Sequence, residues 1–287
     1  MHFPVLREAV LEYLAVPPEG VVLEATAGLG GHTAAIAERL TTGFVIACDR
    51  DAESLEIAKR NTAALAARIR YRQAKFSELG SVLSSCGVEK ADALLADLGV
   101  SRHQLSEDAE RGFSMQADGP LDMRMDRGQG LTAAEIVNTI AEKALADLLY
   151  RFGQERRARR IARAIVRARP IQSTLHLARV VERAAPRTSR LHPATKTFMA
   201  LRVVVNQEQE ELDSLLDMAP ELVRSGGRVV IISFMSLSDA RVKSAFRGLA
   251  QQGRARLLTK HVVRPTEEEV RINAASRSAK LRALELL

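Results

Sequence analysis

The sequence predicts an α/β protein in which a helical segment interrupts an open, mainly parallel sheet of seven strands. Short apolar runs typical of buried parallel strands, such as 21–23 and 44–48, alternate with helical stretches in both halves of the chain. Between about residues 103 and 191 only helical patterns occur. We therefore expect one doubly wound domain made of residues 1–102 and 193–287, with an all-helical domain of residues 103–192 inserted into it.

The first half of the chain carries four strand patterns, and an acidic residue stands at the end of three of them: Glu24, Asp49 and Asp97. The carboxyl ends of parallel strands meet at one edge of a sheet, so these acids are expected to share one site. The predicted elements are a helix at 7–14, a strand at 21–23, a helix from 33 to about 40, a strand at 44–48, a helix at 51–67, and strands at 69–73 and 91–97.

The second half contains the helical insertion and the rest of the sheet. Thr132 is a candidate N-cap for the first inserted helix, and Pro170 and Pro186 separate the helices that follow. The predicted elements are helices at about 133–150, 155–169, 174–184 and 194–223, a strand at 228–234, a helix at 239–250, and strands near 255–263 and at 280–287. We expect the last strand to enter the sheet antiparallel to its neighbours.

Composition indicates a globular protein of 287 residues, of which 46% are hydrophobic and 27% charged. No apolar run approaches the roughly 20 residues that a membrane-spanning helix needs, and the N-terminus lacks the pattern of a signal peptide. The two cysteines give neither a disulfide framework nor metal-ligand spacing. We expect a cytoplasmic protein that has no membrane partner and no metal.

The charge balance favours a polyanionic partner, because 42 Lys and Arg face 35 Asp and Glu, a net charge of +7. Residues 151–169 contain eight arginines and a single acid. On a helix, Arg156, Arg160, Arg163 and Arg167 fall on one side, and such a face repels itself unless phosphates neutralise it. We interpret it as a contact to the RNA backbone; the alternative is a solvated helix face.

The turn after the first strand points to a nucleotide-like cofactor. It carries Gly28, Gly30 and Gly31, which let the backbone approach a ligand, and it opens a helix whose first N–H groups are unpaired. A dinucleotide fingerprint requires a third glycine at Thr33, which disfavours a nicotinamide-dependent oxidoreductase. Asp49 can accept hydrogen bonds from both hydroxyls of a ribose. An acid at the end of the first strand, a glycine loop and an acid at the end of the second strand together form the layout of an S-adenosylmethionine (SAM) site. The alternative is a plain strand–helix turn.

Asp97 lies where enzymes that methylate the exocyclic amines of bases place a polar acceptor for the amine hydrogens. The familiar Asp/Asn-Pro-Pro-Tyr/Phe motif is absent, and the alternative role of Asp97 is to cap the next helix.

Charged and apolar residues alternate over 121–126, next to Gly119-Pro120. This loop could cover the cofactor pocket or could serve only to hold the insertion in place.

The motifs along the chain resemble those of the bacterial small-subunit (16S) rRNA cytosine-N4 methyltransferases of the MraW type, over nearly the whole length. The segment 119–126, Gly-Pro-Leu-Asp-Met-Arg-Met-Asp, is the most specific of them. The others are 2–6 (His-Phe-Pro-Val-Leu), 30–32 (Gly-Gly-His), 49–51 (Asp-Arg-Asp), 97–101 (Asp-Leu-Gly-Val-Ser), 111–114 (Arg-Gly-Phe-Ser), 160–166 (Arg-Ile-Ala-Arg-Ala-Ile-Val), 192–195 (His-Pro-Ala-Thr), 200–203 (Ala-Leu-Arg-Val) with Asn206, and 276–282 (Ser-Arg-Ser-Ala-Lys-Leu-Arg).

The resemblance implies a class I SAM-dependent methyltransferase that acts on N4 of a cytidine in the decoding region of small-subunit rRNA, so its partner is that rRNA or the small ribosomal subunit. It implies SAM contacts at Gly30, Gly31, His32, Asp49, Phe76, Asp97 and Gln104. The oligomeric state is open, and a homodimer is compatible with the sequence.

Two departures from the family motif after the fifth strand bear on activity. Met235 and Ser238 stand where the family has a histidine and a glutamate. The alternative function is therefore a SAM-binding factor in ribosome assembly with reduced or lost catalysis. Because the residues implied to contact SAM are all present, we expect an active enzyme.

Overall fold

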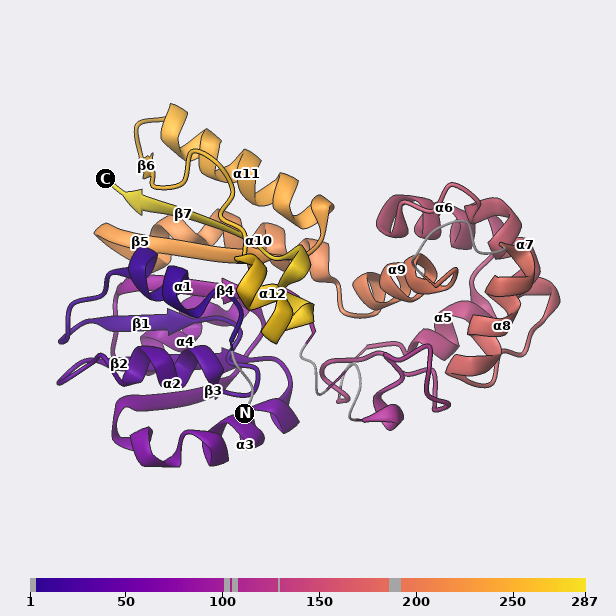
Figure 1. The fold of residues 1–287 in the computed structure, drawn as a ribbon, viewed down its shortest axis with the longest axis horizontal. Coiled ribbons are helices and arrows are strands. Elements are labelled where there is room, and N and C mark those ends of the chain that lie inside the picture. The colour runs from indigo at the N-terminus through magenta and orange to yellow at the C-terminus, as the bar shows by residue number, and fades with distance from the viewer. Residues whose placement is uncertain (1–3, 101–103, 105–107, 129, 186–191) are drawn as a thin grey trace. The chain divides into compact units, whose positions relative to one another are not determined.

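The computed structural model describes residues 4–100, 104, 108–128, 130–185 and 192–287 (Figure 1). These residues form two compact units. Unit 1 combines the N-terminal part of the chain up to Gly99 with Gln209–Leu287, and unit 2 is Val100–Glu208. The described part of unit 2 contains no strand. An α/β unit is thus interrupted by a helical one.

Unit 1 contains a seven-stranded sheet with the strand order β3-β2-β1-β4-β5-β7-β6. Strands β1 to β5 pair parallel to one another, whereas β7 pairs antiparallel to both β5 and β6, as predicted for the last strand. The strands are β1 (Val21–Glu24), β2 (Phe44–Asp49), β3 (Ile69–Gln73), β4 (Ala91–Asp97), β5 (Val223–Ser233), β6 (Ala255–Leu257) and β7 (Lys280–Leu286).

Helices cover both faces of this sheet, which explains why its central strands are apolar without alternation. Successive residues of a strand point to opposite faces, so Val22 and Leu23 enter two different cores. Helices α1 (Arg7–Leu14), α2 (Gly31–Ala37) and α3 (Ala52–Asn61) contribute to the core that contains Val22; α4 (Leu79–Ser85), α10 (Glu208–Leu222) and α11 (Ser236–Gln251) contribute to the core that contains Leu23.

Unit 2 is built from α5 (Ala133–Thr139), α6 (Glu142–Gly153), α7 (Ala158–Arg167), α8 (Thr174–Ala184) and α9 (Thr195–Val205) around a core of their apolar faces. The single helix predicted at 133–150 is two helices, because the chain is extended at Ile140. Arg169 satisfies carbonyl groups at the end of α5: its Nε donates to Val137 O over 2.7 Å and its Nη2 to Ile140 O over 2.5 Å. The 140–141 break is thereby held in place.

The helix predicted at 194–223 is also two helices, because Gln207 adopts φ 51° between α9 and α10. Phe198 and Leu201 of α9 belong to the core of unit 2. The second domain boundary therefore lies at 208/209 and not at 192/193, while the first predicted boundary, 102/103, falls outside the described residues. β5 begins at Val223, earlier than predicted, and helix α12 (Glu267–Ile272) was not predicted.

Candidate cofactor-binding site

The glycine loop between β1 and α2 is a tight turn whose conformation requires glycine at two positions. Gly28 has φ 52° and Gly30 has φ 87°, in the left-handed region that side chains disfavour. A Cβ at Gly30 would lie 2.9 Å from Thr62 Cγ2 on the neighbouring helix, whereas a Cβ at Gly28 would meet nothing within 4 Å. Gly30 therefore allows close packing, and the backbone at Gly28 is open to a ligand.

Glu24 ends β1 directly before this loop and is fully buried. Thr33 Oγ1 of α2 donates a 2.6 Å hydrogen bond to Glu24 Oε2. The other oxygen, Oε1, is buried and has no hydrogen-bond partner among the residues that the structure describes. Burial raises the pKa of Glu24 to about 8. Burial of a carboxyl oxygen that accepts no hydrogen bond lowers the stability of the fold unless a hydrogen-bond donor or a cation binds to it.

Asp49 lies at the end of β2, beside β1. Its Oδ2 accepts a 2.8 Å hydrogen bond from the Gly28 N–H, and its Oδ1 accepts one of 2.9 Å from the Asp51 N–H. The carboxylate thus fixes the glycine loop as well as the start of α3, where Asp51 is the N-cap. Burial outweighs these bonds and raises the pKa of Asp49 to about 6.

Asp97 ends β4, the strand on the other side of β1. Its backbone N–H donates to Thr26 Oγ1 over 2.6 Å, which ties the strand end to the glycine loop. Its Oδ2 lies 3.8 Å from Nε2 of the buried His32. Its Oδ1 is buried without a hydrogen-bond partner in the described part of the chain, and burial raises its pKa to about 7.

The register of the sheet brings these three acids to one edge. Glu24 pairs with Ala47 of β2 and with Leu95 of β4, so Asp49 and Asp97 each lie two residues beyond it on either side. The negative charges of Asp49 and Asp97 also contribute to the raised pKa of Glu24. Three crowded carboxyl groups with little solvation favour a cationic ligand. SAM fits this site, because it carries a sulfonium cation, an ammonium group and two ribose hydroxyls.

The structure thus brings Gly30, Gly31, His32, Asp49 and Asp97 together, while two predicted contacts lie further along the chain. Phe76 opens a short 3₁₀ helix (Phe76–Glu78) just after β3, the strand next to β2. Gln104 is buried and belongs to unit 2. Thr26 and Thr33, which hold Asp97 and Glu24, were not among the predicted site residues; their positions on either side of the glycines are the signal that could have found them.

The residues that depart from the family motif follow β5, the neighbour of β4. Asp97 pairs with Ile232, and Leu98 N donates to Ile232 O over 2.9 Å, so Met235 comes just past the strand ends that carry the site. Ser238 is buried in the first turn of α11. The next residue, Asp239, accepts hydrogen bonds from Arg282 at 2.7 and 3.2 Å and is thereby neutralised.

The loop at 119–126 is a hydrogen-bonded structure within unit 2. Arg124 donates to both carboxylate oxygens of Asp122, over 2.8 and 2.9 Å, and the ion pair lowers the pKa of Asp122. The Asn206 side chain accepts from the Met125 N–H and donates to Met123 O, each over 2.7 Å. Two roles were predicted for this loop, covering the cofactor pocket or holding the insertion in place. These contacts are of the kind that the second, structural role requires.

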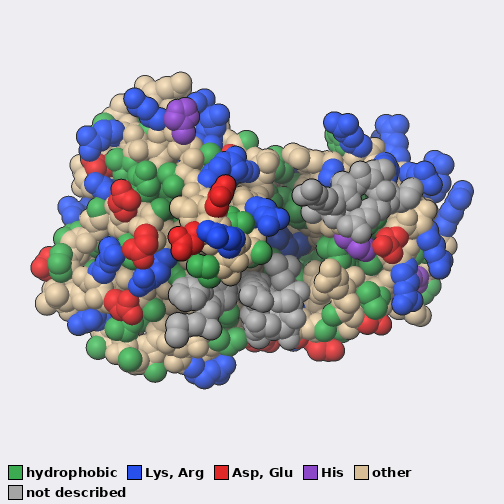
Figure 2. Space-filling view, viewed as in Figure 1, with side chains coloured by type: hydrophobic (Ala, Val, Ile, Leu, Met, Phe, Trp, Pro, Cys, Tyr) green, Lys and Arg blue, Asp and Glu red, His purple; other side chains and the backbone are tan. Residues whose placement is uncertain are grey.

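Helix α7 carries three of the four predicted arginines, Arg160, Arg163 and Arg167, whereas Arg156 lies just before its start. Its apolar side, Ile161 and Ile165, is fully buried in the core of unit 2. The predicted residues Arg156, Arg160, Arg163 and Arg167 are all exposed. Basic side chains gather on the surface of this unit (Figure 2). Among these four, only Arg163 forms an ion pair with a described residue, at 3.4 Å from Glu142. The face is therefore free to contact an anion.

Within the described ranges, no three or more His, Cys, Asp or Glu side chains are grouped so that they could hold a metal ion. None of the helices described combines the length and the apolar character required to cross a membrane.

The sequence was compared with known families, proteins and structures. The sequence model of the MraW methylase family matches residues 1–287. The chain is 61% identical over 286 residues to the "Ribosomal RNA small subunit methyltransferase H" of Solibacter usitatus, covering 100% of both chains. It is 51% identical over 294 residues to the protein of the same name from Acidobacterium capsulatum, covering 99% of this chain and 98% of that one.

Among solved structures, a "putative rRNA-methylase" from Clostridium thermocellum aligns with a TM-score of 0.48 and 13% identity, covering 100% of both chains. The strand order, with β7 antiparallel beside β5, is that of a class I SAM-dependent methyltransferase. The match to the family model along the entire sequence and the 61% identity to a relative covered in full show that the chain belongs to the MraW methylase family of SAM-dependent methyltransferases.

Proposed function

We propose that this protein transfers the methyl group of SAM to the exocyclic N4 amine of a cytidine in the decoding region of small-subunit rRNA. The names of its relatives support methylation of small-subunit rRNA. The observation that carries the choice of an amine is Asp97, a carboxyl group at the end of β4 with a buried, unpartnered Oδ1 among the described residues.

The N4 amine of cytidine is a poor nucleophile because its lone pair is delocalised into the ring. Asp97 can accept a hydrogen bond from this amine, which localises the lone pair on nitrogen and orients it. When bound, SAM supplies an electrophilic methyl carbon whose bond to sulfur breaks as the bond to nitrogen forms. The nitrogen must then lose one proton, and Asp97, with a pKa of about 7, is suited to take it near neutral pH.

The remaining residues of the site hold the cofactor in this proposal. Asp49 accepts the ribose hydroxyls while it fixes the glycine loop through the Gly28 N–H. Glu24 offers its free Oε1 to the positive end of the cofactor. Gly30, Gly31 and His32 line the start of α2. Phe76 and Gln104 complete the proposed set of contacts.

Delivery of the RNA is assigned to unit 2. The exposed Arg156 and the exposed arginines of α7, Arg160, Arg163 and Arg167, contact the phosphate backbone, and the target base is presented unstacked to the site. A ribosomal substrate of this kind places the protein in the cytoplasm.

The proposal is tested by incubating the protein with methyl-labelled SAM and small subunits from a strain that lacks the endogenous enzyme. We expect label on N4 of a single cytidine after nuclease digestion and chromatography. The Asp97→Asn variant serves as the control for background methylation. Recovery of the label on another atom, or no label on rRNA, would contradict the proposal.

A second candidate function is a SAM-binding assembly factor that has lost catalysis, which Met235 and Ser238 favour. It predicts that calorimetry detects SAM binding while the labelling assay detects no turnover. Restoring the family residues with Met235→His and Ser238→Glu would then restore turnover. If the unmodified protein turns over, this candidate is rejected.

A further inference from the structure

Helix α11 of unit 1 carries two cations that the mechanism does not use. Lys243 and Arg247 are exposed and lie one helical turn apart, on the same face of the helix. Neither forms a hydrogen bond or an ion pair with any residue in the described ranges. The other basic residue of α11, Arg241, is paired with Asp213. Two like charges at this spacing repel each other, and an anion between them would remove the repulsion.

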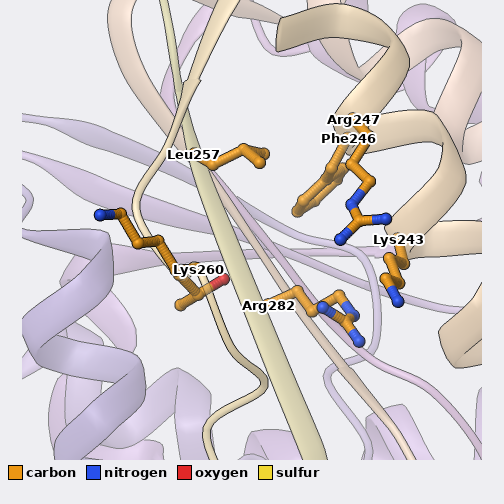
Figure 3. A pocket seen from close by; sticks show the side chains of 7 residues that line it. Lys243, Phe246, Arg247, Leu257, Lys260 and Arg282 are labelled. Carbon is orange, nitrogen blue, oxygen red and sulfur yellow. The ribbon is translucent and has the colours of Figure 1, made fainter.

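A shallow pocket opens beside these cations, between α11, β6 and β7 (Figure 3). Lys243 and Arg247 reach it from α11 and Arg282 from β7, so that their charged ends lie near one another, whereas Lys260 points away from them. Arg282 is fixed by its bidentate ion pair with Asp239. Its apolar lining is the buried Phe246 and the partly buried Leu257, and no Asp or Glu among the described residues lines the pocket.

A second hollow lies against the same two cations, on the outer face of α11. Its other lining residues are Ala240, Ser244, Gly248 and Gln251, again without an acid. A Cβ at Gly248 would meet nothing within 4 Å, so the space beside Gly248 on this side of the helix is open. Lys243 and Arg247 thus stand between two acid-free depressions, and Ser244 and Gln251 add neutral hydrogen-bonding groups. An extended anion can follow the helix here.

From this arrangement we infer that the Lys243–Arg247 face of α11 is a second RNA-binding surface, which contacts phosphates of the substrate RNA away from the target base. A protein partner would require exposed apolar anchors, whereas of the two apolar side chains that line the pocket Phe246 is buried and Leu257 is partly buried. Strands β4 and β5 separate β7 from β1, so these two strands lie about 14 Å apart across the sheet. A long RNA can reach both places.

The inference rests on the proposed rRNA substrate, but it is tested by binding and not by methyl transfer. The probe is a fragment of small-subunit rRNA that contains the decoding region, and its Kd is measured between 50 and 200 mM salt. Lys243→Ala/Arg247→Ala leaves two phosphates without a cation, which would lower the slope of log K against log salt by roughly 1.4–1.8. The ratio of Kd at the two salt concentrations would then fall about 7- to 12-fold.

The matched control is Lys90→Ala/Arg271→Ala, which removes two exposed, unpaired cations from other places in the described part of unit 1. Its slope should change by much less. The exchange Lys243→Arg/Arg247→Lys keeps both charges and should retain the slope of the unmodified protein. An unchanged melting temperature and SAM affinity show that each variant is folded.

Equal slopes for Lys243→Ala/Arg247→Ala and the control would overturn the inference. So would weakened binding to the assembled subunit with unchanged binding to the naked fragment, because the partner would then be an acidic protein. If the slope changes as expected but no rRNA is methylated, the surface stands and the proposed function fails.

Discussion

Thr33 Oγ1 donates a 2.6 Å hydrogen bond to Glu24 Oε2, which joins the end of β1 to the first turn of α2 across the glycine loop. Both residues are fully buried. The bond also opposes the rise in the pKa of Glu24 that burial causes. Thr33 stands where a dinucleotide site would have its third glycine, and here it fixes the acid instead.

Replacing Thr33 with Val should lower the free energy of unfolding by about 1–3 kcal/mol, because a buried carboxyl oxygen loses its donor while the side-chain shape is kept. Chemical denaturation monitored by circular dichroism measures the change. Thr42→Val, at an exposed threonine whose side chain forms no hydrogen bond with a described residue, is the matched control and should change stability by less than about 0.5 kcal/mol. Equal effects would show that the bond contributes little.

The affinity for SAM should rise between pH 6 and pH 8. The pKa values of Asp49, Asp97 and Glu24 are raised to about 6, 7 and 8, so these groups ionise over this range, and a cationic ligand prefers the ionised forms. Binding should release protons, which calorimetry detects in buffers of different ionisation enthalpy. Glu24→Gln should flatten the upper part of the profile. A pH-independent affinity would contradict the assignment.

The same shifts predict the opposite trend for the stability of the protein without ligand. A folded-state pKa above that of the unfolded chain means that the folded protein binds more protons between about pH 4 and pH 8. The stability that these groups contribute is therefore full below about pH 4 and is lost as the pH rises through 6 to 8. Denaturation at several pH values, compared with Glu24→Gln, isolates the contribution of Glu24.

Asp49→Ala should weaken SAM binding by about 10- to 100-fold, because it removes a charged acceptor and frees the Gly28 and Asp51 N–H groups. Calorimetry measures the affinity. Asp92→Ala is a suitable control, because Asp92 accepts hydrogen bonds near the start of β4 and has no part in the site. Asp92→Ala should leave SAM affinity unchanged.

Asp97→Asn should slow methyl transfer by about 100-fold or more at saturating SAM, because the amide cannot take a proton from the substrate amine. Single-turnover rates separate this effect from cofactor binding. A loss of SAM affinity with an unchanged transfer rate would make Asp97 a cofactor ligand only.

Replacing Arg156 together with Arg160 and Arg163 of α7 should reduce the salt slope of RNA binding by roughly 0.7–0.9 for each phosphate that these arginines neutralise. Arg169→Ala is an informative contrast. Its side chain donates to Val137 O and Ile140 O, so its removal should lower stability and leave the slope unchanged. An unchanged slope in the triple variant would make the exposed face of α7 a solvated surface.

Most of the sheet was predictable from the sequence because its strands are buried on both faces and read as uninterrupted apolar runs. The acids at the strand ends were visible for the same reason, since Glu24, Asp49 and Asp97 each follow such a run. The spacing of apolar residues and the local composition are properties of short segments, and the strands with their terminal acids are encoded in such short segments.

The breaks between helices were not predictable, because distant residues determine them. The end of α5 depends on Arg169, and the division between α9 and α10 depends on a left-handed Gln207 beside Asn206, whose side chain bonds the 119–126 loop. The roles of Thr26 and Thr33 likewise became clear only from their hydrogen bonds to β4 and β1.

The position of the insertion has a consequence for synthesis of the chain. Strand β4 pairs with β1 on one side and with β5 on the other, and all of unit 2 is translated between β4 and β5. A nascent chain can therefore assemble β1 to β4 while one edge of β4 stays without its neighbour. Unit 2 is continuous and can fold during this interval, which leaves less flexible chain between β4 and β5 and lowers the entropic cost of adding β5.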